Sequence, residues 1–298
     1  MKLEHNVARS PDRRRDDASN ILLLEHVNLQ IADQQLATLF YVSGLQLTRD
    51  PYLMVGLDNM WINVGRMQFH LPTRSSAPQR LRGVIGLIVP DLDVLENALG
   101  AVAPQLGETQ FSFRRERRFV DASCPWGNRF RCHAPDNARW DLVQLGVMYI
   151  DLDVPAGCAR AIADFYTEMF GAPAAIDVND EGLQTAGVRI GADQRLNFVE
   201  THAAIPIYDG HHIQIYVADF SGPHRRLQAR NLISKDADAH EWRLTDIVDL
   251  HSNIVVYQLE HEVRSTRHPL FGRAFVNRNP TQTNRAYVRG QDAFRGTY

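Results

Sequence analysis

Histidine and polar side chains alternate with apolar ones in the segment LEHVNLQI, residues 24–31. Every second residue of a β-strand points to the same face of its sheet. His26, Asn28 and Gln30 therefore share one face, and Val27, Leu29 and Ile31 share the other, which we expect to pack against a helix. The segment predicts a strand with one polar and one apolar face.

Two more segments repeat this alternation. In residues 67–71, MQFHL, Gln68 and His70 share the polar face. In residues 211–217, HHIQIYV, the polar face carries His212, Gln214 and Tyr216. Neutral imidazoles that adjoining strands deliver to one face suit Fe(II), Mn(II), Ni(II) or Zn(II), so these histidines are candidate metal ligands.

The elements that must position these residues form a repeat of about sixty residues. Four segments begin with an alternating strand, continue with a helical pattern and end in a run of further strands bounded by Gly, Pro, Asn or Asp. Each unit reads β-α-β-β-β, and the four predicted modules span residues 21–77, 78–140, 141–204 and 205–265. Residues 1–20 are expected to be a mobile tail and residues 266–298 an extended arm.

The composition of the 298 residues excludes several classes of protein. The formal net charge is -3, which argues against a nucleic-acid binder that works by bulk charge. Three cysteines cannot form a disulfide framework. Neither a stretch of 18 apolar residues nor an apolar signal core is present. We therefore expect a cytoplasmic protein with no membrane partner and no nucleic-acid partner.

The modules resemble the vicinal oxygen chelate superfamily, which includes glyoxalase I, extradiol ring-cleaving dioxygenases and bleomycin-resistance proteins. The resemblance rests on LEHVNLQIAD with FYVSGL downstream, VMYIDLDVPAG with FYTEMFG downstream, CPWGNRFRCH and DGHHIQIYVADF. It implies an α+β fold of four βαβββ modules paired into two curled mixed β-sheet cups with helices outside. Like two-domain extradiol dioxygenases, the chain is expected to pair consecutive modules into domains at 21–140 and 141–265.

The resemblance also implies a metal inside a cup. The family takes ligands from the first and the last strand of a module, positions that His26 and His70 match, while His212 matches the second histidine of the extradiol triad. The family's carboxylate falls nearest Val256, and Glu260 can serve only if its strand is shifted or bulged. The expected ligands are thus His212, Glu260, His26 and His70, with Fe(II) favoured over Mn(II), Zn(II) and Ni(II).

Other polar residues of the predicted cups are candidates for binding or proton transfer. The predicted substrate-binding residues are Asn28, Arg131, Gln214 and Gln258, and the predicted catalytic residues are Tyr216 and His211. Arg131 stays protonated and cannot bind a metal, but it can hold an anionic group. His133 could complete a set of three metal ligands with His26 and His70. Asp151 or Tyr149 would replace a histidine absent from the third module.

Three functions compete. The first is an extradiol-type dioxygenase acting on a small oxygenated, catecholic substrate, since a 2-His-1-carboxylate face leaves positions for substrate and O2. The second is a glyoxalase-like isomerase, epimerase or lyase that works without O2. The third is a non-catalytic protein that sequesters a small molecule. The expected partners are the small-molecule substrate and further copies of the chain, joined through the C-terminal arm or edge strands.

Overall fold

The structure is a computed structural model that describes residues 18–50, 53, 58–74, 77–136, 140, 143–191 and 193–273. Most of the expected N-terminal tail and most of the C-terminal arm lie outside these residues. The strands are β1 (Ile21–Asn28), β2 (Thr48–Arg49), β3 (Asn59–Val64), β4 (Met67–Pro72), β5 (Gly83–Ile88), β6 (Ser112–Arg115), β7 (Phe119–Ser123), β8 (Arg129–His133), β9 (Gly146–Pro155), β10 (Ala174–Val178), β11 (Gln184–Ile190), β12 (Gln194–Thr201), β13 (His212–Val217), β14 (Ile233–Asp238), β15 (Glu241–Val248) and β16 (Val255–Ser265). The helices are α1 (Gln34–Ala37), α2 (Leu92–Leu106), α4 (Ala159–Phe165) and α5 (Ser221–Gln228), and two π-helical segments, η2 (Thr38–Gly44) and η3 (Tyr166–Phe170), continue α1 and α4.

The strands form two mixed sheets of eight strands each, which confirms the predicted α+β fold class. One sheet has the order β14-β15-β16-β13-β1-β4-β3-β2 and joins the first module to the fourth. The other has the order β10-β11-β12-β9-β5-β8-β7-β6 and joins the second module to the third. The expected pairing of consecutive modules is therefore wrong, because β1 forms its antiparallel ladder with β13 and β5 forms its ladder with β9.

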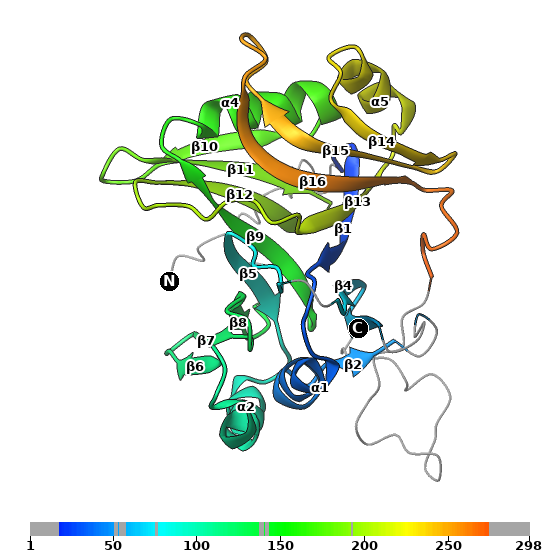
Figure 1. Cartoon of the computed structure of the whole chain (residues 1–298). Coiled ribbons are helices and arrows are strands. Elements are labelled where there is room, and N and C mark those ends of the chain that lie inside the picture. Colours follow the sequence, from blue (N-terminus) through cyan, green and yellow to red (C-terminus); the bar gives the residue numbers. More distant parts are fainter. Residues whose placement is uncertain are drawn as a thin grey trace, which may run out of the picture.

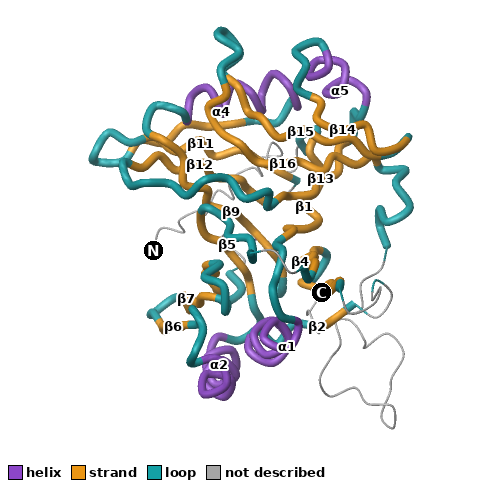
Figure 2. The backbone as a smooth tube through the Cα atoms, viewed as in Figure 1, coloured by secondary structure: helices purple, strands orange, loops and turns teal. Residues whose placement is uncertain are grey.

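Consecutive modules meet through their helices instead. Helices α1 and α2 lie together at the bottom of Figure 1, and α4 and α5 lie together at the top, with both sheets running between them (Figures 1 and 2). At the bottom, Phe40 of η2 packs on Phe130 of β8, with ring centroids 5.4 Å apart. At the top, the Tyr166 hydroxyl is 2.6 Å from Nε2 of His261 on β16. The helix cores thus bury modules one with two and three with four, while the ladders join one with four and two with three.

Carboxylates bind the first backbone N–H groups of three helices. Asp33 accepts hydrogen bonds from the backbone N–H groups of the first turn of α1, and Asp91 does so for α2. Helix α4 has no such cap, and Glu200 of β12 accepts from the Ala159 N–H at 2.9 Å. Helices α1, α2 and α4 therefore each begin with a backbone N–H group bound by a carboxylate.

A bulge in β1 lies where this strand enters the candidate site. The ladder between β1 and β13 shifts register between Leu24 and His26. The side chain of Gln194, on β12 of the other sheet, accepts from the Leu24 N–H at 2.9 Å and donates to the Leu24 carbonyl at 3.1 Å. The other sheet therefore contacts β1 directly at Leu24, the residue that precedes the bulge.

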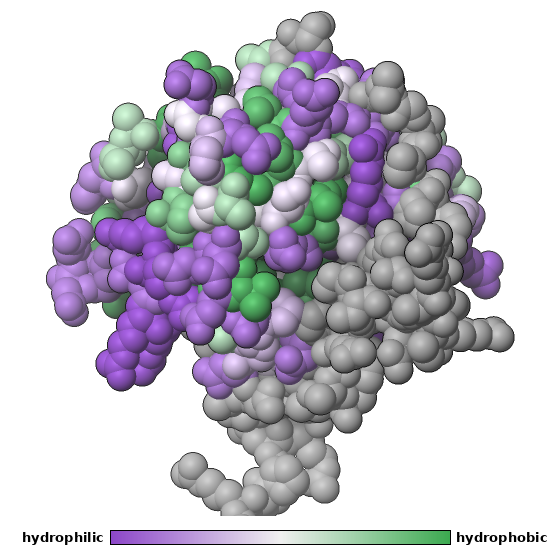
Figure 3. All heavy atoms as spheres, turned by 90° about the horizontal axis from the view of Figure 1, so that it is seen from below, coloured by the Kyte–Doolittle hydropathy of each residue, from purple (hydrophilic) through white to green (hydrophobic). Residues whose placement is uncertain are grey.

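The surface is mixed in character. In Figure 3, the view from below, hydrophilic residues gather on the left, the side of β6 and β7, and hydrophobic residues are scattered among polar ones at the centre. Exposed arginines Arg114, Arg117 and Arg118 belong to this β6–β7 hairpin. Among the described residues, no helix is both long enough and apolar enough to cross a membrane.

Candidate metal centre

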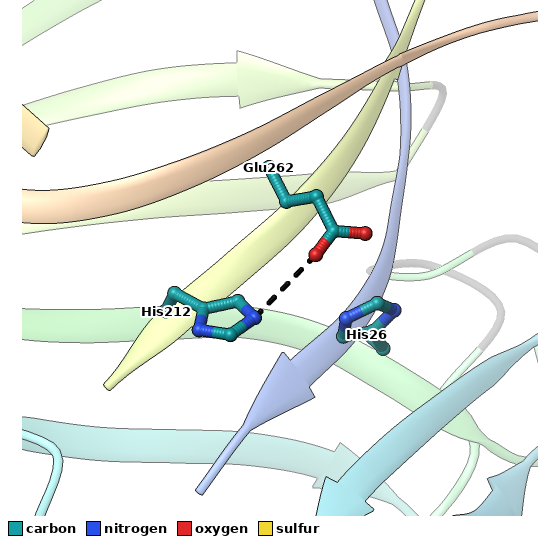
Figure 4. Close-up of side chains that lie close together, drawn as sticks. All are labelled: His26, His212 and Glu262. Carbon is teal, nitrogen blue, oxygen red and sulfur yellow. Dashed lines mark ion pairs between the residues drawn. The ribbon is translucent and has the colours of Figure 1, made fainter. Parts of the chain in front are cut away.

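Three side chains with metal-ligating atoms meet inside the first sheet. His26 comes from β1, His212 from β13 and Glu262 from β16, and one ligand atom of each lies within 4.8 Å of the other two. Figure 4 shows the three side chains pointing toward one another. Nε2 of His212 is 3.6 Å from Oε2 of Glu262. Within the described part of the chain, this is the one cluster of His, Cys, Asp and Glu side chains that could hold a metal ion.

Strand register explains why these residues share a face. His26 lies opposite Gln214 on β13, and Gln214 lies opposite Glu262 on β16. Residues directly opposite in a sheet point to the same side. The next row along holds Asn28, His212 and the side chain of Glu260. The cluster therefore spans two neighbouring rows of the three central strands.

The protonation states suit a cation. Burial lowers the pKa of His212, against the raising influence of Glu262. Burial alone would raise the pKa of the Glu262 carboxyl, but hydrogen bonding with His212 and the charges of Arg264 and Arg243 hold it well below its usual range. A neutral imidazole and an ionised carboxylate are the forms that bind metals.

Glu25 orients the imidazole of His26. Its Oε2 is 2.7 Å from Nδ1 of His26, and both side chains are buried. A carboxylate that accepts from Nδ1–H fixes the tautomer and leaves the other ring nitrogen as a donor of electrons to a metal. Nε2 of His26 is buried and has no hydrogen-bond partner among the described residues.

Charged groups around the cluster are unbalanced. Arg243 contacts Glu241, Glu260 and Glu262, and Arg264 contacts Glu241 and Glu262. With Glu25, the formal sum is four carboxylates against two guanidiniums, an excess of two negative charges. A divalent cation would balance this excess.

Further polar atoms point to a bound group. Asn28 Oδ1 and both amide atoms of Gln214 are buried without a hydrogen-bond partner among the described residues. Buried polar atoms in folded proteins nearly always have partners. Together with the orphaned nitrogen of His26 and the donor types, these atoms show that the site fits a divalent metal and an oxygen-bearing ligand.

His70 lies beside the cluster. Its ring centroid is 5.7 Å from that of His26, but its Nε2 is 2.8 Å from Asn59 Oδ1 and its ring stacks on Trp61 at 3.8 Å. Burial and the neighbouring His26 lower the pKa of His70 to about 2, so the ring is neutral. The structure does not bring His70 into the three-residue cluster.

The carboxylate of the cluster is Glu262, two residues beyond the expected Glu260. Oε1 of Glu260 is 2.6 Å from Arg243 and 3.8 Å from Nδ1 of His212. Glu260 is therefore bound by Arg243 and lies near the His212 imidazole without a hydrogen bond to it. Gln258, two residues before Glu260 on β16, is exposed. Its side-chain amide donates to Asp246 at 2.9 Å, away from the cluster.

The predicted catalytic residues, Tyr216 and His211, are both buried, one on β13 and the other immediately before it. Tyr216 is buried on β13. Burial and the nearby charge of Glu25 raise the pKa of its hydroxyl, Arg264 lowers it, and the result is a pKa of about 12. His211 is fully buried immediately before β13, and its Nδ1 is 2.6 Å from Oδ1 of Asp209. His211 is thus held by a loop residue and does not belong to the cluster.

Residues from the second and third modules lie in the other sheet. Arg131 and His133 are on β8, and Tyr149 and Asp151 are on β9. The expectation that Asp151 or Tyr149 completes a triad with His212 is therefore wrong, as is the grouping of His133 with His26 and His70. The pairing of modules one with four places these side chains in a separate sheet.

Sequence reasoning missed Glu262, Glu25 and Trp61. Glu262 has the same parity as Glu260, and it would have been found had the strand been extended to Ser265, where β16 ends. Glu25 is reached only because of the bulge before His26, for which the sequence carries no signal.

Comparison with known proteins gives similarity in structure only. No family model and no curated protein sequence matches the chain. A candidate dioxygenase from Bacillus subtilis superposes with a TM-score of 0.56 at 13% identity, over 84% of this chain and 87% of the other. Glyoxalase I from Zea mays gives a TM-score of 0.55 at 13% identity, over 85% and 95%, and a variant of that enzyme gives 0.58 at 10%, over 83% and 94%. The chain has the vicinal oxygen chelate fold, as the resemblance implied.

Proposed function

We propose that this chain of the vicinal oxygen chelate fold is a metal-dependent enzyme whose site is His26, His212 and Glu262. One observation carries the proposal: three strands bring two imidazoles and a carboxylate within 4.8 Å of one another in a buried, negatively charged interior. Two histidines and one carboxylate are the donor set of non-haem Fe(II) oxygenases, which leaves positions open for substrate and O2. A bound divalent ion would orient the substrate oxygens and stabilise negative charge on them.

The residues around the donors define what the substrate needs. Three buried side-chain atoms without a partner among the described residues would bind the oxygen substituents of a substrate. Oδ1 of Asn28 and Oε1 of Gln214 would accept hydrogen bonds from substrate hydroxyl groups, and Nε2 of Gln214 would donate one to a substrate oxygen. Tyr216 stays protonated because of its raised pKa, so its hydroxyl can donate a hydrogen bond to an anionic oxygen. Such a substrate is small, carries two adjacent oxygens and becomes anionic on binding, as a catechol does. We therefore favour ring-cleaving dioxygenase chemistry with Fe(II).

A second candidate is an isomerase, epimerase or lyase that works without O2. The position of His70 favours it, since loss of the contact with Asn59 would free a fourth donor beside the cluster. Four protein donors leave fewer open positions, which suits a Lewis acid that polarises one substrate oxygen beside an acidic C–H.

Metal analysis and O2 consumption test the proposal. The chain is purified without chelator, its metal content is measured, and catechol turnover with added Fe(II) is followed with an oxygen electrode. We expect one equivalent of metal, lost in His26→Ala and in His212→Ala but kept in His251→Ala, an exposed histidine outside the site. Turnover of a dicarbonyl or hydroxy-acid substrate without O2 would support the second candidate. Equal metal content in all four proteins would contradict both.

A further inference from the structure

The second sheet carries a cavity of its own. A cavity of about 370 Å³ is lined by side chains from β7, β8, β9 and β12 and by Arg118 of the hairpin before β7. None of its lining residues belongs to the candidate metal centre. Cavities of this size are typical of small-molecule sites.

The ladders relate this cavity to the metal site. Gly86 lies between Tyr149 and Arg131 in the second sheet, as Asn28 lies between His212 and His70 in the first. By the same register, Val84 stands where His26 stands, and Asn197 where Glu262 does. These four positions of the second sheet hold Val84, Arg131, Tyr149 and Asn197, with no imidazole and no carboxylate among them. At these equivalent positions, the second sheet therefore lacks the histidine and carboxylate donors of the metal centre.

A glycine shapes the floor of the cavity. A Cβ atom on Gly86 would lie closer than 3.0 Å to three atoms of the Tyr149 ring. The ring therefore lies across the strand in space that no other residue would leave open. Its hydroxyl is 2.9 Å from Nε2 of His133, which fixes the ring in place. Glycine weakens a strand interior, so the position indicates a close approach that the fold has to accommodate.

Two guanidiniums provide the positive side. Asp121 holds Arg131 through Nε at 2.8 Å and one terminal nitrogen at 3.3 Å, and the guanidinium lies 4.5 Å from the Phe119 ring centroid. The other terminal nitrogen makes no hydrogen bond to a described residue. Arg118 also lines the cavity and makes no ion pair within the described part of the chain. Fixed and free guanidiniums together suit one carboxylate.

The opposite side is polar and carries one carboxylate. Asn197 donates from Nδ2 to Oδ1 of Asp151 at 2.8 Å, and both side chains line the cavity. A carboxylate and an amide in contact can bind a hydroxyl group, which donates to one and accepts from the other. Tyr149, on β9 next to Gly86, lies between this pair and Arg131 and offers apolar surface for a planar ring, whereas Phe119 lies beyond Arg131 on β7.

We propose that this cavity is a second, metal-independent site that binds a small aromatic carboxylate with a hydroxyl group on the far side of its ring. The carboxylate contacts Arg131 and Arg118, the ring contacts Tyr149, and the hydroxyl contacts Asp151. The site does not depend on the activity of the metal centre, because it lies in the other sheet.

Calorimetric titration of the full chain with 4-hydroxybenzoate tests the proposal. We expect saturable binding that 4-hydroxybenzyl alcohol, the neutral analogue, fails to reproduce. Arg131→Gln is expected to weaken binding at least tenfold, and Arg118→Gln, an exposed position that the fold does not need, at least threefold. Arg129→Gln, two residues away on the same strand and paired with Asp153 outside the cavity, is the matched control and is expected to bind as the unmodified chain does.

Three results would overturn the proposal. The first is an absence of saturable binding to the unmodified chain. The second is equal weakening by Arg129→Gln and Arg131→Gln, since this indicates a general charge effect. The third is loss of binding in His26→Ala, because the acid would then occupy the metal centre. Retained affinity in His26→Ala supports a separate site.

Discussion

Glu262→Gln is the substitution that tests the metal centre most directly. Glutamine keeps the shape of the side chain and removes its charge. Breaking a buried ion pair from one side costs about 3–5 kcal/mol when the remaining charge is left alone. Here Glu241 still contacts Arg243 and Arg264, and Glu260 still contacts Arg243, so we expect a smaller loss of unfolding free energy, about 2 kcal/mol.

The effect on metal affinity is expected to be larger. Changes to groups that merely orient a metal ligand cost about 10- to 100-fold in affinity, so loss of a ligand should exceed 100-fold. Metal at 100 times its Kd stabilises a native protein by about 2.7 kcal/mol. At the same concentration, a variant that binds 100-fold more weakly gains only about 0.4 kcal/mol.

Urea denaturation with EDTA or with Mn(II) measures both effects. The difference between the two conditions isolates the metal from the general loss of stability. Glu260→Gln is the matched control, since it removes a carboxylate that contacts the same Arg243 from the same strand. An unchanged increment with Mn(II) in Glu262→Gln, or loss of the increment in Glu260→Gln alone, would refute the assignment of Glu262.

Three other substitutions test neighbouring parts of the structure. Glu25→Gln removes the charge that orients His26, and chelator competition should show metal affinity lowered about 10- to 100-fold, whereas unchanged affinity would leave Glu25 a structural role only. Gly86→Ala forces a methyl group against the Tyr149 ring, and its urea midpoint should correspond to a loss of about 1–3 kcal/mol; a midpoint at or above that of the unmodified chain would contradict the packing. Arg273→Ala removes the guanidinium 2.8 Å from the buried carboxylate of Asp50, and a loss of about 2 kcal/mol in thermal or urea unfolding is expected, with no loss meaning that the C-terminal segment does not hold Asp50.

The sequence by itself determined the local features of this protein. Alternation of polar and apolar residues predicted that His26, Asn28, His212 and Gln214 line the interior of a sheet, and register confirms that they share a face. The repeat of β-α-β-β-β units, together with the family resemblance of its motifs, predicted the fold class. The strand faces are local features because the two-residue period of a strand depends on neighbouring residues alone.

Only the tertiary structure decided which modules share a sheet. All four first strands present similar apolar faces, so nothing local distinguishes pairing of module one with two from pairing with four. The ladder between β1 and β13 brings His26 to His212, and it separates Arg131 from both. The choice between Glu260 and Glu262 depends in the same way on how far β16 extends beside β13. The relative positions of the metal-ligating side chains depend on contacts between segments nearly 200 residues apart. The spacing of residues along the sequence does not predict such contacts.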